Sequence, residues 1–259
     1  MKDDSRYMAP LQLAGRLIME NGGETYRVEE TITRMGRAFG LTEVESFAVP
    51  SGIFISYRGE DGDIRTAVKR VRKGATDLTR VDEVNAVSRL VEAEGLSFEE
   101  VMARLEAIAG RKPRIGPRML LLAAAISSGG WTVLFGGRGW DFACGVAVGA
   151  LVQLLAQLLG RFHMQTMVST LLGSFTAALL PMVFHQLTGL GTVDVIVAGT
   201  LMPMLPGLAM TNAVQDTMRG DMVSGLSHGA SAVLTAVLVA GGALMAASLF
   251  SLLTGGAAL

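Results

Sequence analysis

The distribution of charge constrains the fold of this chain more than any other feature. Residues 1–118 contain nineteen of the 22 Lys and Arg residues and nineteen of the 23 Asp and Glu residues. A run of about 20 apolar residues is long enough to cross a bilayer. The rest of the chain supplies five such runs, and we expect a soluble domain at 1–112 followed by an all-α membrane domain of about five spans at 113–259. The apolar runs lie at roughly 119–136, 139–160, 165–187, 194–213 and 222–253.

The first 112 residues carry the patterns of an α+β domain. Apolar residues at helical spacing predict four helices, the last of which opens with the capping box Ser97-x-x-Glu100. β-branched, aromatic and alternating residues between turn signals predict a three-stranded antiparallel sheet. The predicted helices cover residues 11–20, 24–39, 82–94 and 97–108, and the predicted strands cover 44–49, 53–57 and 64–71.

The fourth apolar run is broken. Pro203, Pro206 and Gly207 interrupt it, and polar side chains follow. Freed backbone groups and polar side chains are tolerated inside a bilayer only where they face protein or a watery cavity. Many secondary transporters build their substrate sites from discontinuous helices of this kind. The break therefore indicates a substrate pathway, and a proline kink followed by a surface loop is the alternative.

Helical spacing after the break groups polar residues on one face. Asn212 offers a donor and an acceptor to a carboxylate or hydroxyl, and Asp216 can bind an amino group or carry a proton. We expect Asp221 to cap the last helix rather than to bind a ligand. Thr211, Asn212 and Asp216 should face a water-filled cavity. The whole predicted face consists of Thr211, Asn212, Gln215, Asp216 and Arg219.

Two further sets of polar residues are candidates for binding. Gln153 and Gln157 lie one turn apart in the second span, where amides either line a cavity or bond to a neighbouring helix. In the soluble domain, the start of the second helix could bind a small carboxylate, with helix capping as the alternative. The candidates there are Glu24, Thr25 and Arg27.

Composition excludes several classes of function. The formal net charge of −1 is balanced within both parts of the chain and indicates no nucleic-acid partner. One cysteine and three scattered histidines suggest no metal set. The sequence contains no evident nucleophile–base pair, phosphate-binding loop or dinucleotide fingerprint. We therefore expect no cofactor, no metal and no enzymatic activity.

Charged flanks predict the orientation in the membrane. The N-terminus lacks the apolar segment of a signal peptide, so we expect the soluble domain to stay in the cytoplasm. Basic residues favour the inner side of a membrane. With the N-terminal domain inside, five spans place the C-terminus outside. Only Arg138 then flanks the outer side, whereas the inner flanks carry Arg111, Lys112, Arg114, Arg118, Arg161 and Arg219.

Several motifs resemble the threonine/serine exporter family, ThrE. They are GRLIMENGGETYRVEET at 15–31, VPSGIF at 49–54, DEVN at 82–85, PGxxxTNAxxD at 206–216 and GDxxSG at 220–225. The resemblance covers nearly the whole chain. It implies gradient-driven export of small polar metabolites, such as threonine, serine or dicarboxylates including succinate, across the bacterial inner membrane.

The split-gene form of the family is especially similar. There, a longer subunit with a soluble domain and about five spans works with a short, separately encoded membrane subunit. This chain lacks the second membrane half of fused members, and it has Gln215 where the family motif leads us to expect a basic residue. We therefore expect it to assemble with a small membrane partner, with itself, or with both.

A second class of function stays open beside the exporter. The chain could be a membrane-anchored hydrolase or a ligand sensor that acts through its cytoplasmic domain. An anchor needs only one or two spans, whereas more than half of this chain lies in apolar spans with a broken polar helix. This difference favours export.

Overall fold

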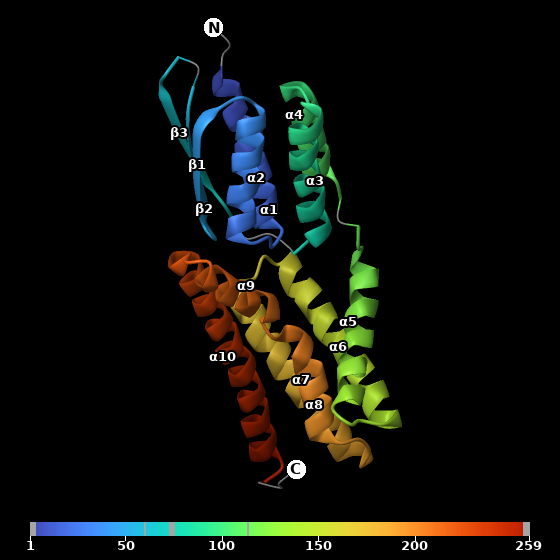
Figure 1. Cartoon of the computed structure of the whole chain (residues 1–259). Coiled ribbons are helices and arrows are strands. Elements are labelled where there is room, and N and C mark those ends of the chain that lie inside the picture. Colours follow the sequence, from blue (N-terminus) through green and yellow to red (C-terminus); the bar gives the residue numbers. More distant parts are fainter. Residues whose placement is uncertain (1–3, 60, 73–75, 113, 256–259) are drawn as a thin grey trace. The chain divides into compact units, whose positions relative to one another are not determined.

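The computed structural model describes residues 4–59, 61–72, 76–112 and 114–255 (Figure 1). The described chain is mostly helical and contains a small antiparallel sheet. Its contacts separate it into two compact units. The first consists of Met1–Lys112 with Met210–Gly229, and the second of Pro113–Ala209 with Ala230–Leu259. The segment that follows the predicted break thus packs with N-terminal residues.

The helices of the first unit confirm the predicted pattern. The unit contains α1 (Met8–Glu20), α2 (Thr25–Ala38), α3 (Leu78–Glu94) and α4 (Phe98–Gly110), preceded by the short 3-10 helix η1 (Asp4–Tyr7). The capping box of Ser97 and Glu100 is present at the start of α4. Helix α3 begins earlier than predicted because the Asp77 carboxylate accepts a hydrogen bond from the Arg80 backbone N–H at 3.2 Å.

The sheet is the predicted three-stranded antiparallel meander. Its strands β1 (Thr42–Val49), β2 (Gly52–Arg58) and β3 (Ile64–Arg70) lie in the order β1-β2-β3. Helices α1 and α2 cover one face, and α3 and α4 lie on the far side of these two helices (Figure 1). Ile53, Ile55 and Tyr57 alternate along β2 and are buried on the covered face.

Small residues let the helices of the second unit approach closely. This unit contains α5 (Pro117–Leu134), α6 (Gly139–Arg161), α7 (Thr166–Thr188), α8 (Val193–Leu201) and η2 (Met202–Met204). A Cβ atom at Gly145 or Gly199 would collide with Thr132 of α5, and one at Gly149 would collide with Ser128. Only glycine therefore fits at these positions, as is common where membrane helices cross.

Two helices contribute residues to both units. Helix α9 (Gly207–Met218) begins in the second unit, and most of its residues belong to the first. Helix α10 (Met222–Leu253) has its first eight residues in the first unit and the others in the second. In the second unit, the Ser174 hydroxyl of α7 donates to the Leu238 carbonyl of α10 at 3.4 Å.

Among the described residues, three helices are long and apolar enough to cross a membrane. They are α6, α7 and α10, and the bent pair Val193–Met204 and Gly207–Met218 makes a fourth if it forms one span. The chain bends by 53° between the two members of this pair, which confirms the predicted break. Helix α5 is outside this set because Pro117, Arg118 and the polar residues near its middle make it less apolar.

Candidate functional site

A buried carboxylate, that of Asp216, lies at the centre of the polar residues in the first unit. Asp216 is on α9 and only 1% exposed. The Thr25 hydroxyl donates to its Oδ1 atom at 2.8 Å, and His228 Nδ1 lies 2.9 Å from its Oδ2 atom. Thr25 is the first residue of α2, and His228 is near the start of α10. Two other helices, α2 and α10, therefore supply the hydrogen-bond partners that a buried carboxylate requires.

The His228 imidazole has a defined chemical role in this arrangement. An ionised carboxylate only accepts hydrogen bonds, so the nitrogen that faces Asp216 must carry the proton. Nδ1–H then donates to Asp216, and Nε2 is the ring nitrogen that does not face this carboxylate. The pair can hold a proton or orient a polar ligand.

A chain of hydrogen bonds connects the start of α10 to α2 through β1. Asp221 Oδ1 accepts from the Ser224 backbone N–H at 3.2 Å, which confirms the predicted cap. The Ser224 hydroxyl donates to the Ala48 carbonyl at 3.3 Å. The Ala48 N–H donates in turn to Glu29 Oε1 at 2.9 Å. The sheet thus fixes the Glu29 carboxylate beside the α9–α10 turn.

Glu29 lies in an unfavourable environment for a negative charge. Partial burial raises the pKa of its carboxyl above the ordinary value, and the nearby charges of Asp221 and Asp216 raise it further. The hydrogen bond from the Ala48 N–H opposes this rise. Glu29 therefore holds a proton more tightly than an exposed glutamate does.

The start of α2 also bears a cation–aromatic cluster. The guanidinium of Arg219 lies 3.5 Å from the ring centroid of Tyr26. Arg27 donates to Glu24 at 2.7 Å and to the Tyr26 hydroxyl at 3.2 Å. Burial alone would raise the pKa of Glu24, but the hydrogen bond and charge of Arg27, with the charge of Arg219, lower it overall.

The residues of the predicted polar face of α9 differ in burial in the structure. Asn212 and Asp216 are buried, whereas Thr211 is exposed. Thr211 and Gln215 line a surface hollow of about 820 Å³ together with apolar side chains. Thr211 thus lies on an exposed side of α9 and Asn212 and Asp216 on a buried side, and a water-filled cavity that all three face stays a prediction. The apolar side chains of this hollow are Met210, Val214 and Met218.

The other predicted site residues lie in different places. Pro203 is in η2, Pro206 directly precedes α9, and Gly207 is its first residue. In the second unit, Gln157 Nε2 donates to the Pro117 carbonyl at 2.9 Å, which is the interhelical bonding named as one alternative. Gln153 is half-buried on the same helix. Of the predicted candidates in the soluble domain, Thr25 bonds to Asp216, and Glu24 and Arg27 pair with each other.

Sequence reasoning did not single out Glu29 or His228. Glu29 falls within the motif at 15–31, but nothing in that motif indicates that it faces the α9–α10 turn. His228 follows Asp216 by twelve residues, and only the turn at Gly220, which has a positive φ of 87°, brings the two side chains together. The described residues contain no group of three or more His, Cys, Asp or Glu side chains arranged to hold a metal ion.

Comparison with known proteins identifies the family. The model of the ThrE family of threonine/serine exporters matches residues 11–250. "Probable succinate transporter subunit YjjP" of Klebsiella aerogenes is 28% identical over 91% of this chain and 90% of its own length. YjjP of Escherichia coli, which carries the same name, is 27% identical over 92% of both chains.

A longer relative matches as well. The "Probable threonine/serine exporter" of Mycobacterium tuberculosis is 24% identical over 92% of this chain but only 46% of its own length. No solved structure matches. Because the family model covers nearly the whole chain, this protein belongs to the ThrE family of threonine/serine exporters.

Proposed function

We propose that the chain is a subunit of a secondary exporter that moves small polar metabolites out of the bacterial cytoplasm. Membership of the ThrE family supports export. The names of the relatives offer two substrate classes, hydroxylated amino acids (threonine and serine) and the dicarboxylate succinate. All these names describe transporters, so the proposed role is not enzymatic.

The observation that best supports this proposal is the buried Asp216 carboxylate on the helix that follows the break. A carboxylate that is buried away from water costs free energy unless hydrogen bonds or a charged partner compensate it. Here the carboxylate is held by Thr25 and His228, and Asn212 lies one turn earlier on the same buried face. We assign substrate or proton binding to Asn212 and Asp216.

The membrane arrangement belongs to the same proposal. Helix α5 completes a set of five spans with α6, α7, the bent pair and α10. Residues 1–112 form the cytoplasmic domain, and residues 113–259 form the domain in the inner membrane, with the C-terminus outside. The excess of basic residues on the inner flanks supports this orientation. Pro113 and Leu259, at the ends of the membrane domain, lie outside the described residues.

We further propose that the chain acts with a partner. Transporter sites commonly lie between repeated halves, and this chain contains one broken helix pair among its described residues. The word "subunit" in the names of both YjjP relatives supports an assembly. The partner is a small, all-membrane subunit, a second copy of the chain, or both.

Export from cells tests the site. Asn212→Ala and Asp216→Asn should each lower the export of radiolabelled threonine or succinate by about tenfold or more, because each removes a polar contact worth about 1.5–3 kcal/mol when charged. Asp194→Asn is a matched control, since Asp194 is exposed at the start of the same broken span. If both variants export at near-normal rates at equal membrane levels, Asn212 and Asp216 do not bind substrate or protons for export. The break would then be only a structural kink.

A further inference from the structure

A second polar site lies in the first unit, in a cavity beside α2. Its volume is about 530 Å³, within the range of about 300–1,000 Å³ typical of small-molecule pockets. The buried residues of the proposed pathway, Asn212 and Asp216, do not line it. Its walls come from α2, α3 and the turn after α9. The lining residues are Tyr26, Glu29, Glu30, Thr33, Arg34, Arg37, Glu92 and Arg219.

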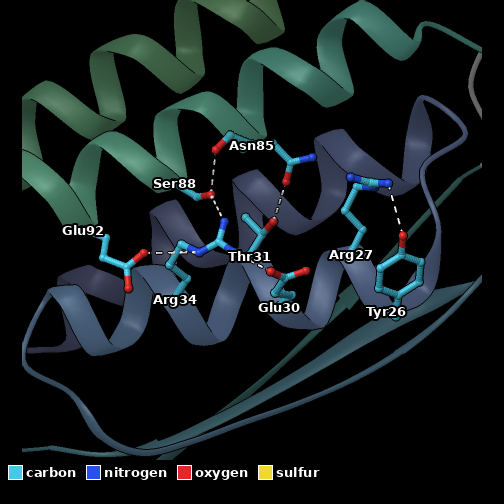
Figure 2. Close-up of polar contacts among 8 residues, drawn as sticks. All are labelled: Tyr26, Arg27, Glu30, Thr31, Arg34, Asn85, Ser88 and Glu92. Carbon is cyan, nitrogen blue, oxygen red and sulfur yellow. Dashed lines mark hydrogen bonds and ion pairs between the residues drawn. The ribbon is translucent and has the colours of Figure 1, made fainter. Parts of the chain in front are cut away.

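The charges of this lining balance. Glu29, Glu30 and Glu92 oppose three arginines. Figure 2 shows Arg34 between the carboxylates of Glu30 and Glu92, with which it forms ion pairs, and it also bonds to the Ser88 hydroxyl. Arg34 offsets one of these two carboxylates, so the middle of the cavity keeps one negative charge. The other charged side chains of the lining are Glu29, Arg37 and Arg219.

Arg219 is positioned to receive a carboxylate. Its guanidinium lies over the face of the Tyr26 ring, with 3.5 Å between the guanidinium carbon and the ring centroid. A stacked guanidinium keeps its N–H groups in its own plane, where they can bind both oxygens of a carboxylate. Tyr26 is held in turn, because Arg27 donates to its hydroxyl (Figure 2).

Glu29 provides the opposite charge. Its Oε1 atom accepts the Ala48 N–H, which fixes the carboxylate in place and leaves Oε2 for a cation. Asp216 and Asp221 lie close enough to act on Glu29 electrostatically. The field at this end of the cavity therefore attracts a positive group and repels a negative one.

We propose that this cavity is a ligand site for a free α-amino acid, whose ammonium group binds Glu29 and whose carboxylate binds Arg219, with Arg37 as a second cation. A zwitterion matches a lining with three positive and three negative side chains. A dicarboxylate would place its second negative charge beside Glu29, Asp216 and Asp221. Of the two substrate classes named for the relatives, the cavity therefore selects the amino acid over succinate.

The site lies at the turn between α9 and α10, and this position connects it to export. The connection rests on the proposed function. Arg219 follows α9 directly, three residues after Asp216, and the turn it occupies leads into α10. An amino acid held between Glu29 and Arg219 would stabilise the contact of this turn with α2. Occupancy of the cavity would thus report the cytoplasmic amino-acid level to the segment that carries Asp216.

Binding to the purified full-length chain in detergent tests the proposal. Titration calorimetry should show saturable binding of threonine and serine, and at least tenfold weaker binding of succinate. Glu29→Gln and Arg219→Gln should each weaken threonine binding by about tenfold or more, while Glu94→Gln and Arg104→Gln, both exposed in the same unit, should not. Gln at position 29 can still accept the Ala48 N–H, so the fold should persist, as a thermal melt would show.

The pH dependence of binding provides a second readout. Since the pKa of Glu29 is raised, an ammonium ligand should bind less tightly as the pH falls from about 7 to 5, and binding should release protons. The charges of Asp216 and Asp221 act on Glu29 and are present in every variant. If part of the pH dependence of ligand affinity disappears in Glu29→Gln, protonation of Glu29 itself causes that part.

The outcomes separate the two proposals. Equal affinity for succinate and threonine, or wild-type affinity in both Glu29→Gln and Arg219→Gln, would overturn the amino-acid site. Cells that export metabolite through a chain that binds no amino acid after purification would also overturn it, while leaving the exporter proposal intact. Amino-acid binding by a chain that exports nothing would contradict the proposed function alone.

Discussion

The contact between Thr25 and Asp216 should hold the α9–α10 segment against α2, and Thr25→Val removes it with little change in shape. Both residues are buried, and the hydroxyl donates to the carboxylate at 2.8 Å. Valine keeps the β-branched form but leaves Oδ1 of Asp216 without this donor. A hydrogen bond to a charged group contributes about 1.5–3 kcal/mol. We expect the segment to lose stability of this size relative to its detached state.

Hydrogen exchange measured by mass spectrometry can detect this loss. Each 1.4 kcal/mol corresponds to about a tenfold change in an equilibrium constant, so local opening should become about 10–150 times more frequent. Amides in peptides covering 210–229 should therefore exchange faster in Thr25→Val by this factor. The hydrogen-bond partners of Asp216 lie on α2 and α10, so peptides from α4 should be unchanged and provide an internal control.

Two further variants decide whether the hydrogen bond is the cause. Thr25→Ser keeps the hydroxyl and should exchange much like the wild type. In an Asp216→Asn background the effect of Thr25→Val should shrink, because the two residues act through one contact. If residues 210–229 exchange at the wild-type rate in Thr25→Val, the contact does not hold the segment and the reasoning fails.

Three other changes have defined outcomes. Asp221→Ala removes the cap of α10 and should lower stability by about 1 kcal/mol, seen as a lower melting temperature, whereas Asp221→Asn should largely preserve it. Glu29 binds its proton more tightly in the folded state, so its contribution to stability is present below about pH 4.5 and is lost as the pH rises through its raised pKa. The melting temperature of Glu29→Gln should therefore rise relative to that of the wild type as the pH is raised from about 4.5 to 8. A difference in melting temperature that does not change with pH would contradict this. An alkaline phosphatase fusion after Leu259 should be active outside the cytoplasm, and activity of a cytoplasmic reporter alone would reverse the proposed orientation.

Local patterns in the sequence predicted the elements well. The four α-helices of residues 1–112, the three strands and the break after Leu201 all follow from spacing, turn residues and proline chemistry, which act within a few residues. The last apolar run, predicted at 222–253, matches α10. The start of α3 was missed because Asp77 caps the helix before its apolar periodicity begins.

The assembly of the candidate site could not be predicted in the same way. The hydrogen bond between Thr25 and Asp216 joins residues separated by 191 positions. Helical spacing placed Thr211 and Asp216 on one face, but the packing partner decides which edge of that face is buried. It is α2, through Thr25, that buries Asp216 and leaves Thr211 exposed. Only tertiary contacts carry this information.

The glycines of the second unit affect how tolerance to mutation should be interpreted in this family. Gly145, Gly149 and Gly199 stand where helix backbones nearly touch, and any larger residue there collides with Thr132 or Ser128. A scan of all substitutions would find these positions as intolerant as Asp216, because helix packing alone excludes larger residues there. In this fold, invariance alone is therefore a poor guide to the transport site, and assays must separate the amount of folded protein from its activity.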